Sequence, residues 1–85
     1  MPRTRTSRYA RDYRVLLDLL REYRKDAEVT QVDLAASLKT SQSVISKLEQ
    51  GVVRMDLMEL LGYLDAIKVD PVEFLGQFLA KIGRR

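Results

Sequence analysis

Two short helices are predicted over about residues 31–38 and 42–50, and the few residues between them constrain the fold more than any other feature of the sequence. Thr30 and Ser41 precede these segments, and both are residue types that cap helix N-termini by accepting a backbone hydrogen bond. Gly51 follows the second segment, where a helix commonly ends in a left-handed residue. Both ends of the second helix therefore carry termination signals.

The turn between these helices must be tight, because the apolar residues on either side of it need to share one core. Leu38, at the end of the first helix, can approach Ile45 and Leu48 of the second only if the two helices cross steeply. Two short helices joined by three or four residues at roughly 90–120° form a helix-turn-helix. The spacing therefore predicts this geometry for the middle of the chain.

Three further helices are predicted around this pair, and no segment has the alternating pattern of a strand. The longest runs from Tyr9 to about Lys25, where tyrosines and leucines recur at spacings of one, three and four residues. One more helix begins after Asp56, and the last begins after Asp70, with proline in its first turn. We therefore expect an all-α fold, with a single compact five-helix domain over residues 9–82.

The composition excludes most kinds of active site. The chain has neither cysteine nor histidine, which removes disulfides, thiolate zinc sites, cysteine nucleophiles and imidazole acid–base chemistry. Asp65 and Asp70 are interpreted as surface charge and a helix cap, because no pocket is indicated around them. We expect no enzymatic activity, no metal and no cofactor.

No part of the sequence is long and apolar enough to indicate a membrane segment. A membrane-spanning helix needs roughly 20 mainly apolar residues, and no stretch approaches this length. The basic N-terminus is not followed by the apolar region of a signal peptide. We therefore expect a cytoplasmic protein without membrane association.

One stretch of the chain resembles the helix-turn-helix of the Cro and phage-repressor family of bacterial regulators, also called the xenobiotic-response-element (XRE) family: residues 29–51, VTQVDLAASLKTSQSVISKLEQG. The resemblance covers about residues 15–75 without gaps. Its strongest elements are Thr30-Gln31, Leu34-Ala35, Ser41-Gln42, the run from Ile45 to Glu49, and Gly51. The resemblance implies a lambda-repressor-like DNA-binding domain. Lys39 and Lys68 depart from the pattern, because the family commonly has glycine at these two turns.

The resemblance implies a sequence-specific transcriptional regulator, a repressor or an activator, whose second short helix enters the major groove of double-stranded DNA. The outward positions of residues 42–50 carry glutamine, serine and lysine instead of acids, which suits a helix that approaches a polyanion. The residues that this family would use to read bases are Gln42, Ser43, Val44, Ser46 and Lys47.

The chemistry of these side chains leaves some assignments open. The amide of Gln42 offers one donor and one acceptor, which match those of adenine in the major groove. Lys47 is suited equally to a guanine edge and to a phosphate, and Val44 either contacts a thymine methyl group or belongs to the core.

A second set of residues flanks the reading helix and is expected to contact the DNA backbone: Gln31, Lys39, Thr40 and Arg54. The resemblance implies that Gln31 also braces Gln42, although both could be plain surface amides. For the other three, a solvated loop is the alternative. The resemblance further implies that Glu49 turns inward and forms a structural ion pair with Arg24.

The positive charge of the chain is concentrated near its N-terminus. Residues 1–14 contain five arginines and one aspartate, a net charge of +4, whereas the rest of the chain sums to −1. We interpret residues 1–8 as a basic N-terminal arm and residues 83–85 as a basic tail. The arm is either a solvated tail or a contact to phosphates or the minor groove, and the sequence leaves both open.

The last helix bears on assembly, because its apolar face is wider than one core requires. We expect part of this face to form a homodimer interface, with Phe74, Phe78, Leu79 and Ile82. The alternative is that all of it packs inward. A two-fold dimer would set two reading helices about 34 Å apart on a palindromic operator.

The sequence leaves two classes of function open. The first is the DNA-binding regulator, with RNA polymerase or another regulator as a further partner and with a bacterial, phage or mobile-element origin. The alternative is a protein-interaction module, an antitoxin or antiactivator, that reuses the same fold to bind another protein.

Overall fold

The computed structural model describes residues 8–83, and in this part of the chain it contains five helices and no strand. The helices are α1 (Arg8–Asp26), α2 (Gln31–Ser37), α3 (Gln42–Gln50), α4 (Leu57–Ala66) and α5 (Pro71–Lys81). The all-α class predicted from the sequence is confirmed. Arg8, which the predicted arm included, is instead the first residue of α1, and the rest of that arm, like residues 84–85 of the tail, lies outside the described residues.

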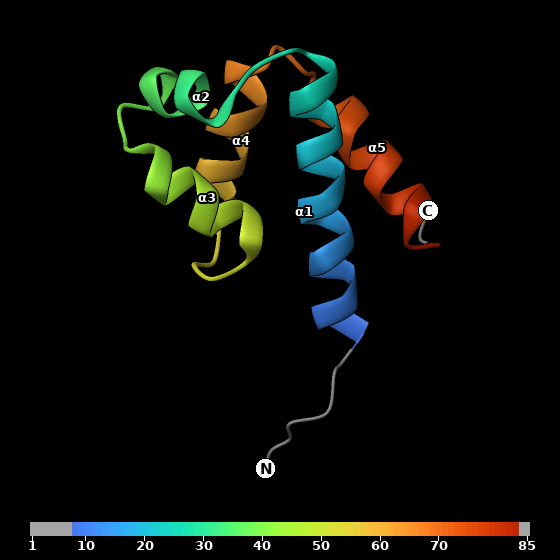
Figure 1. Cartoon of the computed structure of the whole chain (residues 1–85). Helices are drawn as coiled ribbons and strands as arrows, with labels where there is room; N and C mark the ends of the chain where they lie inside the picture. Colours follow the sequence, from blue (N-terminus) through green and yellow to red (C-terminus); the bar gives the residue numbers. More distant parts are fainter. Residues whose placement is uncertain (1–7, 84–85) are drawn as a thin grey trace.

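The long helix α1 runs through the middle of the fold, with α2, α3 and α4 on one side of it and α5 on the other (Figure 1). Helix α3 packs on α2 and α1, whereas α5 packs on α1 and α4. The largest fully buried side chains come from all five helices: Leu17, Leu20, Leu34, Ile45, Tyr63, Leu64 and Phe74. One core therefore holds α3 against the longest helix.

Both short helices begin at the cap residues that the sequence indicates. The Thr30 hydroxyl accepts a hydrogen bond from the Asp33 backbone N–H at 3.0 Å, and the Asp33 carboxylate accepts one from the Thr30 N–H at 3.4 Å. The Ser41 hydroxyl accepts from the Val44 N–H at 3.2 Å. Gly51 ends α3 in the left-handed conformation, with φ of 83°. The start and end of α3 are thus set by local chemistry.

Two lysines occupy the turns where glycine would be the less strained residue. Lys39, between α2 and α3, has φ of 57°, and Lys68, between α4 and α5, has φ of 62°. A residue with a side chain in this conformation costs roughly 1–2 kcal/mol. The conformation persists because the next residue closes the preceding helix: the Thr40 N–H donates to the Ala35 carbonyl at 2.9 Å.

Candidate nucleic-acid interface

The outward side of α3 is uncovered and carries no exposed acid. Its exposed or half-exposed polar residues are Gln42, Ser43, Ser46, Lys47 and Gln50. Ile45, Leu48 and Glu49 are the buried residues of this helix. Glu49 is the one acid of α3, and it is only 2% exposed. The row of five polar residues, which we call the reading surface, is therefore free of negative charge and accessible to a polyanion.

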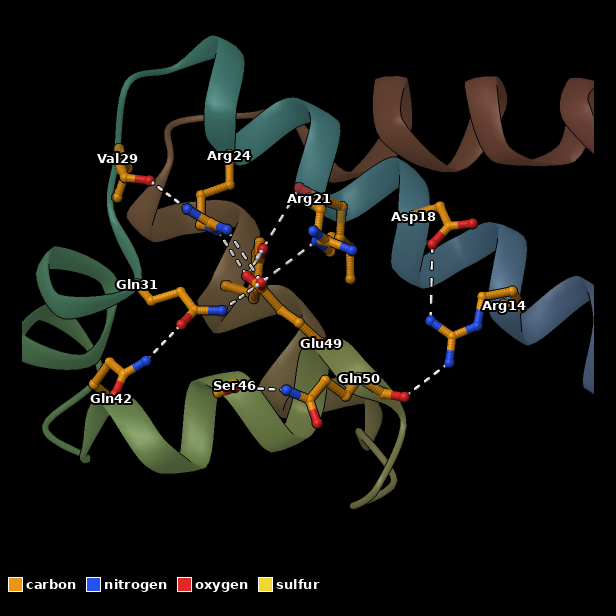
Figure 2. Close-up of polar contacts among 12 residues, drawn as sticks. Arg14, Asp18, Arg21, Arg24, Val29, Gln31, Gln42, Ser46, Glu49 and Gln50 are labelled. Atoms are coloured by element: carbon orange, nitrogen blue, oxygen red, sulfur yellow. Dashed lines mark hydrogen bonds and ion pairs between the residues drawn. The ribbon is translucent and has the colours of Figure 1, made fainter.

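Glu49 is held inside the fold by a two-point ion pair with Arg24 of α1 (Figure 2). The Arg24 Nε donates to Glu49 Oε2 at 2.7 Å, and Nη2 donates to Oε1 at 3.1 Å. The third guanidinium nitrogen, Nη1, donates to the Val29 carbonyl at 2.9 Å. This ion pair, which the family resemblance implied, thus connects α1 to α3 and to the segment that leads into α2.

Two neutral side chains also donate hydrogen bonds to the Glu49 carboxylate. The Tyr63 hydroxyl of α4 donates to Oε2 at 2.6 Å, and the Gln31 amide donates to Oε1 at 2.9 Å. Burial alone would raise the pKa of Glu49, but the hydrogen bonds from Arg24, Tyr63 and Gln31 outweigh burial and lower it. Burial, followed by the bond to the Glu49 carboxylate, raises the pKa of Tyr63. Glu49 therefore stays ionised and Tyr63 stays neutral near neutral pH.

The same network orients the first residue of the reading surface. A carboxylate only accepts hydrogen bonds, so Gln31 must turn its NH₂ group to Glu49 and its carbonyl oxygen to Gln42. Gln42 accordingly donates from its Nε2 to Gln31 Oε1 at 2.6 Å (Figure 2). This leaves the carbonyl oxygen and the second N–H of Gln42 for an external partner. A buried charge thus fixes which way a surface amide faces.

Arg14 holds the other end of α3. Its Nη2 donates to the Gln50 carbonyl at 2.7 Å, at the negative end of the helix dipole. A Cβ atom on Gly51 would lie 3.1 Å from this nitrogen, so glycine also leaves room for the contact. This role of Arg14 was not predicted from the sequence, although a signal exists: Arg14, Arg21 and Arg24 are spaced by seven and three residues and therefore share one face of α1.

The other residues predicted to contact DNA lie at both ends and at the edge of α3. Lys39 and Thr40 are exposed in the turn before α3, next to the reading surface. Val44 is 40% exposed, so it is not a core residue, and it lines a hollow between α3 and α4. Arg54, in the segment after α3, is also exposed, and its guanidinium stacks over the Tyr13 ring at 4.4 Å.

The assignment of Phe74 to a dimer interface is wrong. Phe74 is 1% exposed and packs edge-to-face on Tyr23 of α1, with ring centroids 5.4 Å apart. It belongs to the core because α5 turns this position toward α1. The other three predicted interface residues are half-buried and line a groove between α1 and α5: Phe78, Leu79 and Ile82.

A second apolar surface was not anticipated from the sequence. It consists of Val52, Val53, Leu57 and Met58, in and after the segment that joins α3 to α4. Leu57 is 67% exposed and Met58 is 72% exposed. The leucine-rich pattern of α4 is apolar on too many sides for periodicity to separate inside from outside.

Residues 8–83 contain no helix that is long and apolar enough to cross a membrane. In the same part of the chain, no three acidic side chains gather in a way that would hold a metal ion.

Comparisons with known proteins agree with this geometry. A model of the family described as helix-turn-helix domain matches residues 15–75. Among solved structures, the chain is similar to an XRE-family like protein from Pseudomonas syringae pv. tomato str. DC3000, with 38% sequence identity and a TM-score of 0.82. The match covers 86% of this chain and 89% of that one. No curated protein matches the chain.

Proposed function

We infer that this chain, which belongs to the XRE-type helix-turn-helix family of DNA-binding regulators, places α3 in the major groove of a palindromic operator as a homodimer. The observation that carries this proposal is the acid-free reading surface, whose one neighbouring carboxylate, Glu49, is buried and paired. Members of this family are typically not enzymes, and we propose regulation of transcription by occupancy of DNA, in the cytoplasm, as repressor or activator.

The proposed base contacts come from the residues of α3 that are exposed beside one another. Gln42 offers its remaining donor and acceptor to an adenine edge, and the bond to Gln31 holds the amide in place. Ser43, Ser46 and Lys47 follow along the helix, with Val44 at its edge for a thymine methyl group. Ser46 accepts a hydrogen bond from Gln50 at 2.9 Å, which leaves its own hydroxyl proton for DNA.

The proposed backbone contacts are Gln31, Lys39 and Thr40, which flank the reading surface. Arg54 is exposed and stacks over the Tyr13 ring, and the N–H donors in the plane of its guanidinium remain for a further phosphate. The hydroxyl of Tyr13 also accepts from the Met55 N–H at 2.9 Å. We therefore propose that Arg54 contacts a phosphate while it and Tyr13 hold the segment after α3 against α1.

Gln42→Ala is expected to weaken specific binding by about 1–3 kcal/mol and to relax the preference for one base pair. Lys47→Ala should also weaken binding. A phosphate contact by Lys47 predicts an equal loss for all DNA sequences. Fluorescence anisotropy with DNA from immediately upstream of the gene, compared with a scrambled duplex, measures both effects. Gln77→Ala is the matched control, because Gln77 is an exposed glutamine on α5, across α1 from α3.

The alternative function is binding of another protein, as an antitoxin or antiactivator. The exposed apolar surface of Val52, Val53, Leu57 and Met58 favours it, because surfaces of this kind commonly mark protein contacts. A further partner such as RNA polymerase would also fit there. Failure of the wild-type chain to bind any duplex at low salt would favour this alternative over DNA recognition.

Ile82→Glu is expected to convert the proposed homodimer to monomer, because the charge would be buried at the groove of Phe78, Leu79 and Ile82. Sedimentation equilibrium measures the change. Met58→Glu is the control on the second apolar surface. If Met58→Glu dissociated the dimer and Ile82→Glu did not, the interface would lie at the surface of Val52, Val53, Leu57 and Met58 instead. A monomeric wild-type chain would reject the homodimer.

A further inference from the structure

Arg21 places a positive charge beside α3 that the fold does not fully neutralise. It lies on α1 next to Glu49 (Figure 2), with its Nε 3.9 Å from Glu49 Oε1 and its side chain 45% exposed. Arg24 is much closer to the same carboxylate, at 2.7 Å, and its side chain is 8% exposed. Two guanidinium groups thus share one carboxylate, and the outer one carries the surplus charge.

The Glu49 carboxylate has no hydrogen-bonding capacity left for Arg21. Its Oε2 accepts from Arg24 and Tyr63, at 2.7 and 2.6 Å. Its Oε1 accepts from Arg24 and Gln31, at 3.1 and 2.9 Å. A carboxylate has about four lone-pair positions, and all are used. The distance of 3.9 Å to Arg21 is accordingly too long for a hydrogen bond, so the planar donor group of Arg21 is left for solvent or a ligand.

The side of Arg21 that faces α3 suits an anion, whereas its other side borders a hollow shared with Asp18, Glu22 and Lys25. Arg21, Gln31, Glu49 and Gln50 line a hollow of about 260 Å³ between α1 and α3. Gln50 belongs to the reading surface and Gln31 braces Gln42, so the hollow borders that surface. Glu49 contributes little repulsion, because it is 2% exposed and paired with Arg24. The accessible groups of the hollow are therefore a guanidinium and two amides.

We propose that Arg21 binds a backbone phosphate of the DNA strand that passes the C-terminal half of α3. The inference rests on the proposed function, because it requires α3 to enter the groove. A guanidinium binds a phosphate through two parallel N–H···O bonds, and the long, half-exposed contact to Glu49 is weak enough to give up. Because phosphate contacts carry no base information, Arg21 positions the domain on DNA and does not read sequence.

Arg21→Gln is expected to weaken binding about tenfold, equally for the upstream duplex and for a scrambled duplex. The slope of log K against log salt concentration should fall by about 0.9, which is the signature of one lost phosphate contact. Arg21→Lys should keep most of that slope, since it keeps the charge, but lose affinity with the second hydrogen bond. Fluorescence anisotropy over a range of salt concentrations measures both quantities.

Lys81→Gln is the matched control, because it removes one positive charge from the exposed side of α5, across α1 from α3. It should leave the salt slope unchanged. A wild-type slope and affinity in Arg21→Gln would overturn the proposal, as would a lowered unfolding temperature with an unchanged slope, which would mean a structural role. If the wild-type chain bound no duplex, the proposed function itself would fail, which is a different result from loss of the Arg21 effect alone.

Discussion

Arg24→Met is expected to lower the free energy of unfolding by about 3–5 kcal/mol near neutral pH. The variant leaves the Glu49 carboxylate buried, at 2% exposure, with Tyr63 and Gln31 as donors. The only positive charge that remains beside it among the described residues is Arg21, at 3.9 Å and half-exposed, which compensates it weakly. The variant also leaves the Val29 carbonyl without the Arg24 Nη1 donor. Urea unfolding followed by circular dichroism measures the change.

The loss of unfolding free energy caused by Arg24→Met should become smaller at acidic pH. This pH dependence follows from the pKa of Glu49. The folded protein lowers this pKa, so the stability that Glu49 contributes is present above its unfolded pKa and is lost as the pH falls through the folded value. In the variant, the Arg24 hydrogen bonds that offset the effect of burial are gone, so the pKa of Glu49 rises. As the pH falls, Glu49 is protonated first in the variant, at its higher pKa, and later in the wild type, at its lowered pKa. The difference in unfolding free energy between the two proteins narrows across this range.

Arg21→Met is the matched control for this prediction, because it removes an arginine from the same helix and the same carboxylate. Its contact with Glu49 is 3.9 Å long and 45% exposed, so the loss should stay below about 1 kcal/mol. Equal losses in the two variants would show that Arg24 contributes only long-range charge. A double variant, Arg24→Met with Glu49→Gln, should recover part of the loss, since it removes the unpaired charge.

Phe74→Ala is expected to lower the free energy of unfolding by about 3–5 kcal/mol, and the loss should not depend on protein concentration. The ring is 1% exposed and joins α5 to Tyr23 of α1, so its removal leaves a cavity within one subunit. Urea unfolding in dilute, monomeric solution is the measurement. Phe78→Ala, at a half-buried position four residues on, should cost less.

The concentration dependence separates a core position from an interface position. A core cavity destabilises the isolated subunit, whereas an interface residue matters only when a partner is bound. If Phe74→Ala destabilised the chain only at concentrations where the wild type is dimeric, Phe74 would belong to the interface after all.

The features that depend on neighbours along the chain could be predicted from the sequence. The hydroxyls of Thr30 and Ser41 accept the hydrogen bonds that begin α2 and α3, and Gly51 ends α3 in the left-handed conformation. These are interactions across three or four residues, which residue type and spacing largely determine. The Arg24–Glu49 pair came from the family resemblance and not from local rules.

The contacts that depend on how helices rotate against one another could not be predicted from the sequence. Phe74 and Leu79 are both apolar residues of α5, and only the packing of α5 on α1 makes the first buried and the second half-exposed. The stack of Arg54 on Tyr13 joins residues that are 41 positions apart in the sequence. Residue spacing and composition do not predict these contacts, because each contact depends on how the helices pack in three dimensions.

The hydrogen-bonded path from Arg24 through Glu49 and Gln31 to Gln42 has an evolutionary consequence. A substitution along that path would alter folding and the aim of Gln42 together, so such changes should be rare during divergence. Ser43 and Lys47 stand outside it, because no hydrogen bond among residues 8–83 ties their side chains to the path. Under the proposed function, new base preferences should therefore arise most readily by substitution at these two positions, while the inherited amide keeps its orientation.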